Sequence, residues 1–379
     1  MKLITKLTLT ALLLSSFQLF AQDAAEMPAT DPTLAPVAEE KEQEEPSFSL
    51  TGYVDAYYQA NFSTSASAGE APLVFGSSFT DLANTFGIGN VNLLAEKTVG
   101  KVGFVGQIGF GPRAVAANSD SNSDFPGLNF ASTVQQLFVT YSPSESVTFS
   151  LGNFGTFVGY EVIDAPANMN YSMSYLFSNG PFYHTGLKVD FALAEGFGAM
   201  VGVFNDTDSK VDVIGGKHIG AQLSAETGGL ATYLNFLYGV EGEDLLDEED
   251  LTEFQVDLTA TLEVSESFML GLNASSYSTA LDGNAAGGFF GAALYATAGL
   301  NETTDLSFRG EYFGGTAAEG DTSDQPNVIA LTASGNFKIG ELRIIPELRF
   351  DTGSNGFTFG DDVSDESAFA FLLAGVYSF

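Results

Sequence analysis

The sequence predicts an all-β protein, a transmembrane antiparallel β-barrel of about sixteen strands, within about two strands either way. Three observations lead to this fold. Apolar and polar residues alternate from Ser47 to Phe379, connectors of contrasting length separate the alternating segments, and one face of these segments carries almost no charge. A sheet with one apolar and one polar face suits a closed barrel between lipid and water, because an open sheet edge in hydrocarbon leaves backbone groups unpaired.

The N-terminal residues precede the alternating region. MKLITKLTLTALLLSSFQLFAQ has two lysines, a leucine-rich stretch and Ala21 before Gln22, which predicts a signal peptide over residues 1–21. Residues 22–46 are rich in Pro and Glu, and this composition predicts a disordered acidic linker. No later stretch approaches the ~20 apolar residues of a membrane helix. The mature protein is therefore either exported and soluble, or it crosses a membrane as a β-barrel.

The two-residue period begins at Ser47. In SFSLTGYVDAYYQANF, the apolar Phe48 and Leu50 fall on one face, and the polar Thr51 and Asp55 fall on the other. The same alternation recurs in TEFQVDLTATLEV and in ELRIIPELRFD. Strands are therefore predicted to begin at about residues 47, 86, 101, 132, 147, 181, 197, 216, 230, 252, 267, 288, 304, 327, 341 and 367.

The connectors between these strands differ in length. Short ones such as SPSES, TGG and NET alternate with longer ones rich in Gly, Asp and Ser. This rhythm is typical of outer-membrane barrels, which have short periplasmic turns and longer extracellular loops.

Charge placement separates the two faces of the predicted strands. The charge on the outward face is that of Lys97, beside a short turn, whereas Asp257, Glu347 and Arg349 lie on the opposite face. A lipid-facing Lys or Arg costs about 2–4 kcal/mol at the bilayer midplane and little near the interface. The outward face therefore suits lipid, and the inward face suits water.

The last strand, SAFAFLLAGVYSF, ends the chain on an aromatic residue. Tyr377 and Phe379 share its apolar face, and this ending resembles the C-terminal assembly signal of bacterial outer-membrane barrels. It is predicted to be a lipid-facing closing strand whose rings lie at a membrane interface.

Two blocks of the chain carry a family resemblance. GYVDAYYQANF and NFGTFVGYEVIDAPANMNYSMSYLFSNGPFYHTG resemble the β-barrel porin type 2 family, the OmpL-like outer-membrane porins. The resemblance implies a pore in the outer membrane of a Gram-negative bacterium. It implies no particular residues for solute choice.

The connector over about residues 153–180 is the candidate for a constriction of the lumen. Its acids Glu161 and Asp164 are expected to face bases across a narrowed channel. Those inward-pointing bases are Arg309, Arg343, Arg349 and Lys338. Opposed charges in a narrow aqueous gap favour small polar solutes over apolar ones. The alternative interpretation is that Arg309–Glu311 and Glu347–Arg349 are ion pairs within the wall, without a role in selectivity.

The predicted function is passive diffusion of small hydrophilic solutes or ions through a water-filled barrel. One rival is a structural or adhesion barrel with a plugged lumen. Another is a barrel hydrolase that uses His184, with Ser178 nearby in SNGPFYHTG. A Ser–His pair also needs hydrogen-bond geometry and an orienting third group, so the chain is not predicted to be an enzyme.

Composition limits the partners. Because 48 Asp and Glu outnumber 13 Lys and Arg, phosphate is repelled and nucleic acid is not expected to bind. No cofactor or metal site is predicted. The acidic run EGEDLLDEEDLTE is interpreted as a solvated loop, with divalent bridging to lipopolysaccharide as the alternative. Expected partners are outer-membrane lipid, lipopolysaccharide, the barrel-assembly machinery and small hydrophilic solutes. The sequence does not define the oligomeric state, and a homotrimer is a candidate because sixteen-strand porins are commonly trimers.

Overall fold

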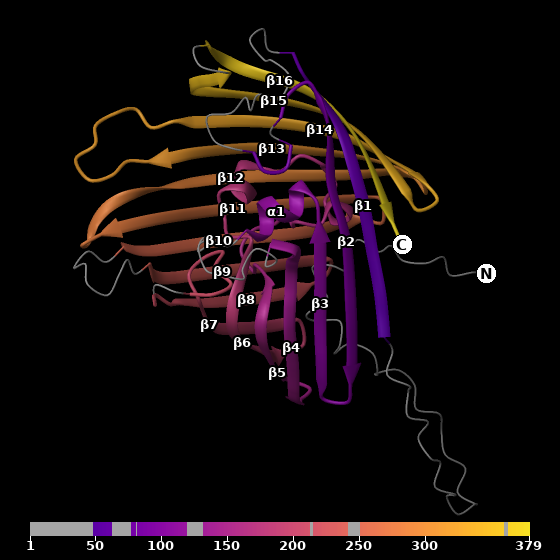
Figure 1. Cartoon of the computed structure of the whole chain (residues 1–379), viewed down its shortest axis with the longest axis vertical. Helices are drawn as coiled ribbons and strands as arrows, with labels where there is room; N and C mark the ends of the chain where they lie inside the picture. Colours follow the sequence, from indigo (N-terminus) through magenta and orange to yellow (C-terminus); the bar gives the residue numbers. More distant parts are fainter. Residues whose placement is uncertain are drawn as a thin grey trace, which may run out of the picture. The chain divides into compact units, whose positions relative to one another are not determined.

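The chain forms a closed antiparallel β-barrel of sixteen strands in a computed structural model (Figure 1). The structure describes residues 48–62, 77–80, 82–119, 132–212, 215–241, 251–359 and 363–379. The predicted signal peptide and acidic linker, and most of the run EGEDLLDEED, lie outside these residues. The strands are β1 (Phe48–Asn61), β2 (Thr85–Val99), β3 (Val102–Phe110), β4 (Val134–Ser144), β5 (Val147–Gly155), β6 (Tyr183–Ala194), β7 (Phe197–Phe204), β8 (His218–Thr227), β9 (Leu230–Glu241), β10 (Leu251–Ser265), β11 (Phe268–Leu281), β12 (Asn284–Asn301), β13 (Thr304–Thr316), β14 (Asn327–Ile339), β15 (Leu342–Phe359) and β16 (Val363–Ser378).

The predicted fold class and strand number are confirmed. The largest differences in the strand starts are at β12 and β16, which begin at residues 284 and 363. The early start of β12 has a local cause. Asp282 and Gly283 have φ of 49° and 79°, the left-handed pair of a two-residue hairpin turn that twists with its strands. The connector after β11 is therefore tight, and the predicted alternation of short and long connectors fails at this hairpin.

The two faces of the wall follow the two-residue period. On β10 the outward Phe254 is 45% exposed and the inward Asp257 is 1% exposed. On β15 the outward Leu348 is 47% exposed and the inward Glu347 is 1% exposed. The polar face is thus turned to the lumen, as the sequence predicts, and the apolar face forms the outer surface.

The barrel closes between its first and last strands. β1 pairs with β16 from Tyr53–Ser378 to Asn61–Ala370. Beyond this ladder the N–H of Gly52 donates to Phe379 O and the N–H of Phe379 donates to Gly52 O, both at 2.9 Å. The Tyr377 and Phe379 rings lie on the outer face, 43% and 55% exposed. Their role as an assembly signal stays a prediction.

The helical elements are short and belong to connectors. Among the described residues they include α1 (Pro112–Asn118), the 3₁₀ turn η2 (Ala165–Ala167) and α2 (Tyr175–Ser178). In the part of the chain that the structure describes, no helix is long and apolar enough to cross a membrane. η2 and α2 both lie in the connector between β5 and β6, which occupies the lumen.

Candidate functional site

The candidate site is the connector of residues 156–182, called here the luminal loop. Residues 170–177 of this loop are all buried, and Met173 and Tyr175 have no exposed surface. Tyr175 and Leu176 pack on apolar residues of β12, β13 and β14. On another side Ala165 and Tyr171 pack on β1, β15 and β16. The aromatic and Met-rich composition of this segment therefore has a packing explanation.

The first part of the luminal loop, residues 156–161, is called here the strap, and it reaches from β6 to β13. Each of its anchors is on a different strand. The anchors are Thr156 Oγ1 with His184 Nε2 on β6 at 3.0 Å, Phe157 O with Gln222 Nε2 on β8 at 3.4 Å, Gly159 N with Asp257 Oδ1 on β10 at 3.0 Å, the Tyr160 ring on Tyr295 of β12 at 4.4 Å, and Glu161 Oε1 with Arg309 Nη1 on β13 at 2.6 Å.

Two wall glycines leave room for the aromatic side chains of the strap. A Cβ atom at Gly220 would overlap the Phe157 ring, and a Cβ atom at Gly271 would overlap the Tyr160 hydroxyl. The Phe157 ring also packs on His184 and Phe204, with centroid separations of 4.8 and 5.7 Å. The strap thus lies in van der Waals contact with the wall at β8 and β11.

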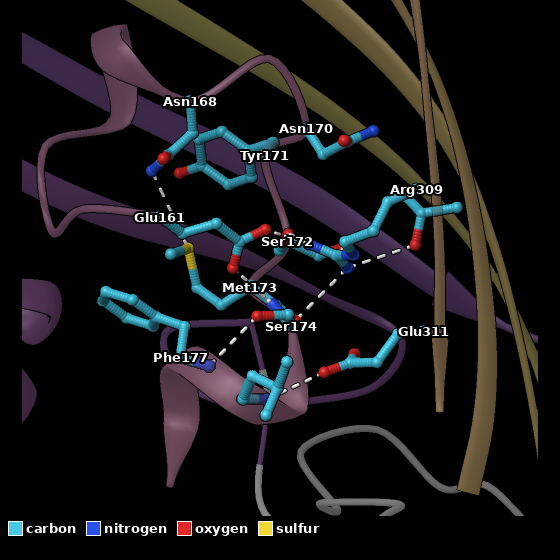
Figure 2. Close-up of polar contacts among 12 residues, drawn as sticks. Glu161, Asn168, Asn170, Tyr171, Ser172, Met173, Ser174, Phe177, Arg309 and Glu311 are labelled. Carbon is cyan, nitrogen blue, oxygen red and sulfur yellow. Dashed lines mark hydrogen bonds and ion pairs between the residues drawn. The ribbon is translucent and has the colours of Figure 1, made fainter. Parts of the chain in front are cut away.

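Glu161 and Arg309 are in direct contact (Figure 2). Arg309 Nη1 donates to Glu161 Oε1 at 2.6 Å and to the carbonyl of Ser172 at 2.6 Å. Glu161 Oε2 accepts the N–H of Ser174 at 2.7 Å. Glu161 is 5% exposed and Arg309 is 2% exposed. The structure therefore brings this predicted acid and base together in a buried ion pair.

Asp164 lies against the wall of β1, β3 and β4. Its carboxylate accepts hydrogen bonds from Gln107 Nε2 at 2.9 Å, Gln135 Nε2 at 2.9 Å and the Tyr53 hydroxyl at 3.2 Å. Burial raises the pKa of Asp164 above its ordinary value, and these hydrogen bonds oppose that rise. Its hydrogen-bond partners are neutral groups.

Two wall carboxylates each hold a pair of consecutive backbone N–H groups in the luminal loop. Glu347 accepts from Tyr171 N at 2.7 Å and from Ser172 N at 3.1 Å. Glu311 accepts from the N–H groups of residues 175 and 176 at 2.9 and 2.8 Å. Hydrogen bonds that involve an ionised group are roughly twice as strong as neutral ones. These contacts fix the backbone of the loop to β13 and β15.

Three of the four predicted wall bases also bind the backbone of the luminal loop. Arg343 Nη2 donates to the carbonyls of Ala165 and Asn168 at 2.7 and 3.1 Å. Arg349 Nη1 donates to the carbonyl of Met173 at 2.7 Å. Lys338 instead pairs with Asp305 at 2.8 Å near the short-turn end, and its side chain is 32% exposed.

The alternative wall ion pairs differ from those observed. Arg349 pairs with Asp351 at 2.9 Å and Arg309 pairs with Glu161. Among the ion pairs of the described residues, neither Arg309–Glu311 nor Glu347–Arg349 occurs. Glu311 and Glu347 were missed as loop ligands. Their inward position was evident from the two-residue period, but the period does not identify the backbone that they bind.

The geometry defines the class of the protein. A closed sixteen-stranded barrel with an apolar outer face and a polar inner face is that of outer-membrane porins. The chain belongs to the family described as "Putative beta-barrel porin-2, OmpL-like", whose sequence model matches residues 47–379. This match confirms the resemblance carried by the two sequence blocks. A search of curated proteins gives no match.

Solved structures share the fold at low sequence identity. The in-vitro folded trimer form of OmpT from Vibrio cholerae has a TM-score of 0.60 and 13% identity, covering 88% of this chain and 99% of that one. The outer-membrane channel DcaP of Acinetobacter baumannii has a TM-score of 0.58 and 15% identity, with 89% and 99% covered. An anion-selective porin from Comamonas acidovorans has a TM-score of 0.57 and 14% identity, with 88% and 100% covered. At these identities the similarity concerns the fold alone.

Proposed function

We propose that this protein is a porin of the Gram-negative outer membrane through which small hydrophilic solutes and ions diffuse passively. The observation that carries the proposal is the closed sixteen-stranded wall with a polar inner face. About eight strands leave an interior that side chains can fill, whereas barrels of sixteen to eighteen strands enclose an aqueous channel.

We also propose that the luminal loop narrows this channel. Its fixed position supports the idea, because Arg309, Arg343 and Arg349 bind its carbonyls and Glu311 and Glu347 bind its N–H groups. Glu161 and Asp164 are buried on the loop side of the same arrangement. In this proposal these charges set the position of the loop and thereby the size of the opening.

Charges of both signs below the luminal loop support small polar solutes as the cargo. Lys188 and Asp190 on β6 pair at 3.2 Å with side chains 17% and 16% exposed. Lys338 and Asp305 pair nearer the short turns, with side chains 32% and 13% exposed. A lumen lined by fixed charges orders water and disfavours apolar solutes.

Swelling of liposomes that contain the purified protein tests the proposal. Swelling in isotonic sugar is expected to be fast for small sugars and to slow as the sugar grows. Swelling at the rate of protein-free liposomes for every sugar would contradict passive diffusion.

Swelling at the rate of protein-free liposomes would favour the second candidate, a structural barrel with a plugged lumen. One observation supports it. The luminal loop makes apolar contacts on several sides of the wall, including Phe157 with Phe204 on β7 and Tyr175 with Phe313 on β13.

Catalysis by His184 has less support in the geometry. His184 is 1% exposed, its Nε2 lies 3.0 Å from Thr156 Oγ1, and its ring packs on Phe157 and Phe204. We propose a packing role for this residue. A His184→Ala variant that lost hydrolysis of lipid or peptide would contradict that role.

We further propose insertion by the barrel-assembly machinery, contact with lipopolysaccharide, and assembly as a homotrimer. The trimer form of the Vibrio cholerae protein, which shares the fold, supports the last point. The mass of the purified protein, corrected for detergent by light scattering, is expected to be that of three chains, and a monomer mass would contradict it.

A further inference from the structure

We infer that the permeation route runs between the strap and the inner face of β10 and β11, and that Asp257 gives this route a preference for cations. The inference rests on the proposed porin function and deepens it. It differs from the sequence-based expectation, which assigned the acidic side of the constriction to Glu161 and Asp164.

The two parts of the luminal loop are held to the wall with different strength. Residues 161–176 are bound to β13 and β15 by ionised groups, among them Arg309, Glu311 and Glu347. Against β10 and β11 the strap has few polar bonds. Gly159 N donates to Asp257 Oδ1 at 3.0 Å, and the Tyr160 hydroxyl bonds Thr261 and lies against Gly271. The β13 and β15 side is therefore closed by several charge-assisted bonds, whereas the β10 and β11 side has one bond to a carboxylate and one between neutral hydroxyls.

A cavity of about 10 Å³ lies at this weaker contact. The wall side of the cavity is polar and consists of Gln255, Asp257, Asn273 and Ser275. Its loop side includes Val158 and Gly159 and, from the returning part of the loop, Gly180 and Pro181. A space of this size holds about one water molecule. A polar, water-sized space between loop and wall marks where a small shift of the strap opens a path.

Gly159 makes such a shift inexpensive. Its φ is +91°, and a Cβ atom there would meet nothing within 4 Å. Backbone in this region is accessible to glycine at little cost and to other residues with strain. The strap therefore has its most adaptable residue at the position that bonds Asp257.

Asp257 retains an uncompensated negative charge beside the cavity. Its carboxylate accepts from Gly159 N at 3.0 Å, Asn235 Nδ2 at 2.9 Å and Asn273 Nδ2 at 2.6 Å, all neutral donors. Among the ion pairs of the described residues, none includes Asp257. By contrast, Arg309 neutralises Glu161.

Asp164 also accepts hydrogen bonds from neutral donors. However, it lies under the loop against β1, β3 and β4, where Gln107, Gln135 and Tyr53 surround it. Asp257 instead faces the strap and the cavity. Of the two carboxylates, Asp257 is therefore the one beside the inferred route.

The wall on the short-turn side of Asp257, at β8 and β10, continues this acidic character. Along β10, Thr259 and Thr261 lead to the exposed Glu263. On β8, Glu226 is half-buried and accepts from the Tyr233 hydroxyl at 2.7 Å. A cation that passes Asp257 therefore enters a region where further carboxylates attract it.

Reversal potentials across a planar bilayer with a KCl gradient test the charge of Asp257. A unit charge about 7 Å from an ion in water changes the local concentration of that ion about threefold. We therefore expect Asp257→Asn to lower the potassium-over-chloride permeability ratio by about threefold or more, and Asp257→Glu to retain the wild-type ratio. A ratio that is the same for wild type and Asp257→Asn would overturn the inference.

Cysteine accessibility tests the position of the route, since the chain contains no cysteine. Ser275→Cys lies on the cavity, whereas Ala374→Cys on β16 lies under the luminal loop beside Ala165 and Tyr171. A positively charged methanethiosulfonate reagent is expected to reduce the current of the first variant and to leave that of the second unchanged. Block at Ala374→Cys without block at Ser275→Cys would overturn the inferred route. Wild-type protein that carries no current would instead contradict the porin function itself.

Discussion

The buried Glu161–Arg309 pair gives the most quantitative prediction. Replacing Arg309 by Met removes the guanidinium that lies 2.6 Å from Glu161 and keeps a similar apolar volume. The Glu161 carboxylate, 5% exposed, then retains the N–H of Ser174 as a hydrogen-bond donor but has lost its base. Removing one partner of a buried ion pair costs about 3–5 kcal/mol, because a charge is left buried without compensation.

The expected loss is therefore about 3–5 kcal/mol in the free energy of unfolding. It is measured by denaturant titration of the protein in phospholipid vesicles. Arg309→Lys is the matched control, since it keeps the charge and loses the planar fork, and we expect a smaller loss. In single-channel recordings Arg309→Met should also show more current fluctuation, because the same guanidinium holds the carbonyl of Ser172.

A double variant separates the ion pair from general damage to packing. Glu161→Gln combined with Arg309→Met removes both charges, so we expect it to be more stable than Arg309→Met alone. The pair does not fix the luminal loop if the free energy of unfolding of Arg309→Met lies within about 1 kcal/mol of the wild-type value. The same conclusion follows if the double variant is no more stable than Arg309→Met alone.

Gly271, Asp208 and Phe379 each give a further prediction. Gly271→Ala places a Cβ atom against the Tyr160 hydroxyl, so we expect Tyr160 to leave the wall and the displaced strap to change the single-channel conductance. Unchanged conductance would show that Tyr160 does not border the permeation path. Burial raises the pKa of Asp208 to about 7, so between about pH 4 and 7 the folded protein keeps a proton that the unfolded chain has lost. Stability then falls as pH rises through this window, and Asp208→Asn should lose part of that fall when the unfolding temperature is measured against pH. Parallel profiles of unfolding temperature against pH for wild type and Asp208→Asn would contradict this prediction. Deleting Phe379 removes its two 2.9 Å backbone hydrogen bonds with Gly52, so we expect less folded barrel in outer-membrane fractions. Phe379→Tyr, which keeps a terminal aromatic ring, is the control, and wild-type levels of the deletion variant would refute the assembly role.

The barrel could be predicted from the sequence because its information is local. Each strand carries its own two-residue period, and a wall between lipid and water imposes that period on every strand. The hairpin at Asp282–Gly283 was not predicted, although the dipeptide is a strong turn signal, because the alternation of connector lengths indicates a long connector there. The inward direction of Arg309 and Arg349 followed from the same period.

The partners of those inward charges could not be predicted. Arg309 and Glu161 are 148 residues apart, and the sequence does not determine which carboxylate the folded loop brings to the guanidinium. Gly220 and Gly271 carry no sequence signal for receiving aromatic rings, since their role depends on the position of the strap. The two-residue period predicts that Asp257 faces inward, but its lack of a basic partner depends on the folded loop and the neighbouring strands, which supply neutral donors.

The central claim is that water and ions cross this barrel past a luminal loop that narrows it. Single-channel recording of the purified protein in a planar bilayer tests that claim most directly. We expect discrete current steps whose size rises with KCl concentration. The steps of wild type should be smaller than those of a variant with residues 157–181 replaced by a short Gly/Ser linker. A current no greater than that of the bare bilayer for wild type, or equal step sizes for the two proteins, would contradict it.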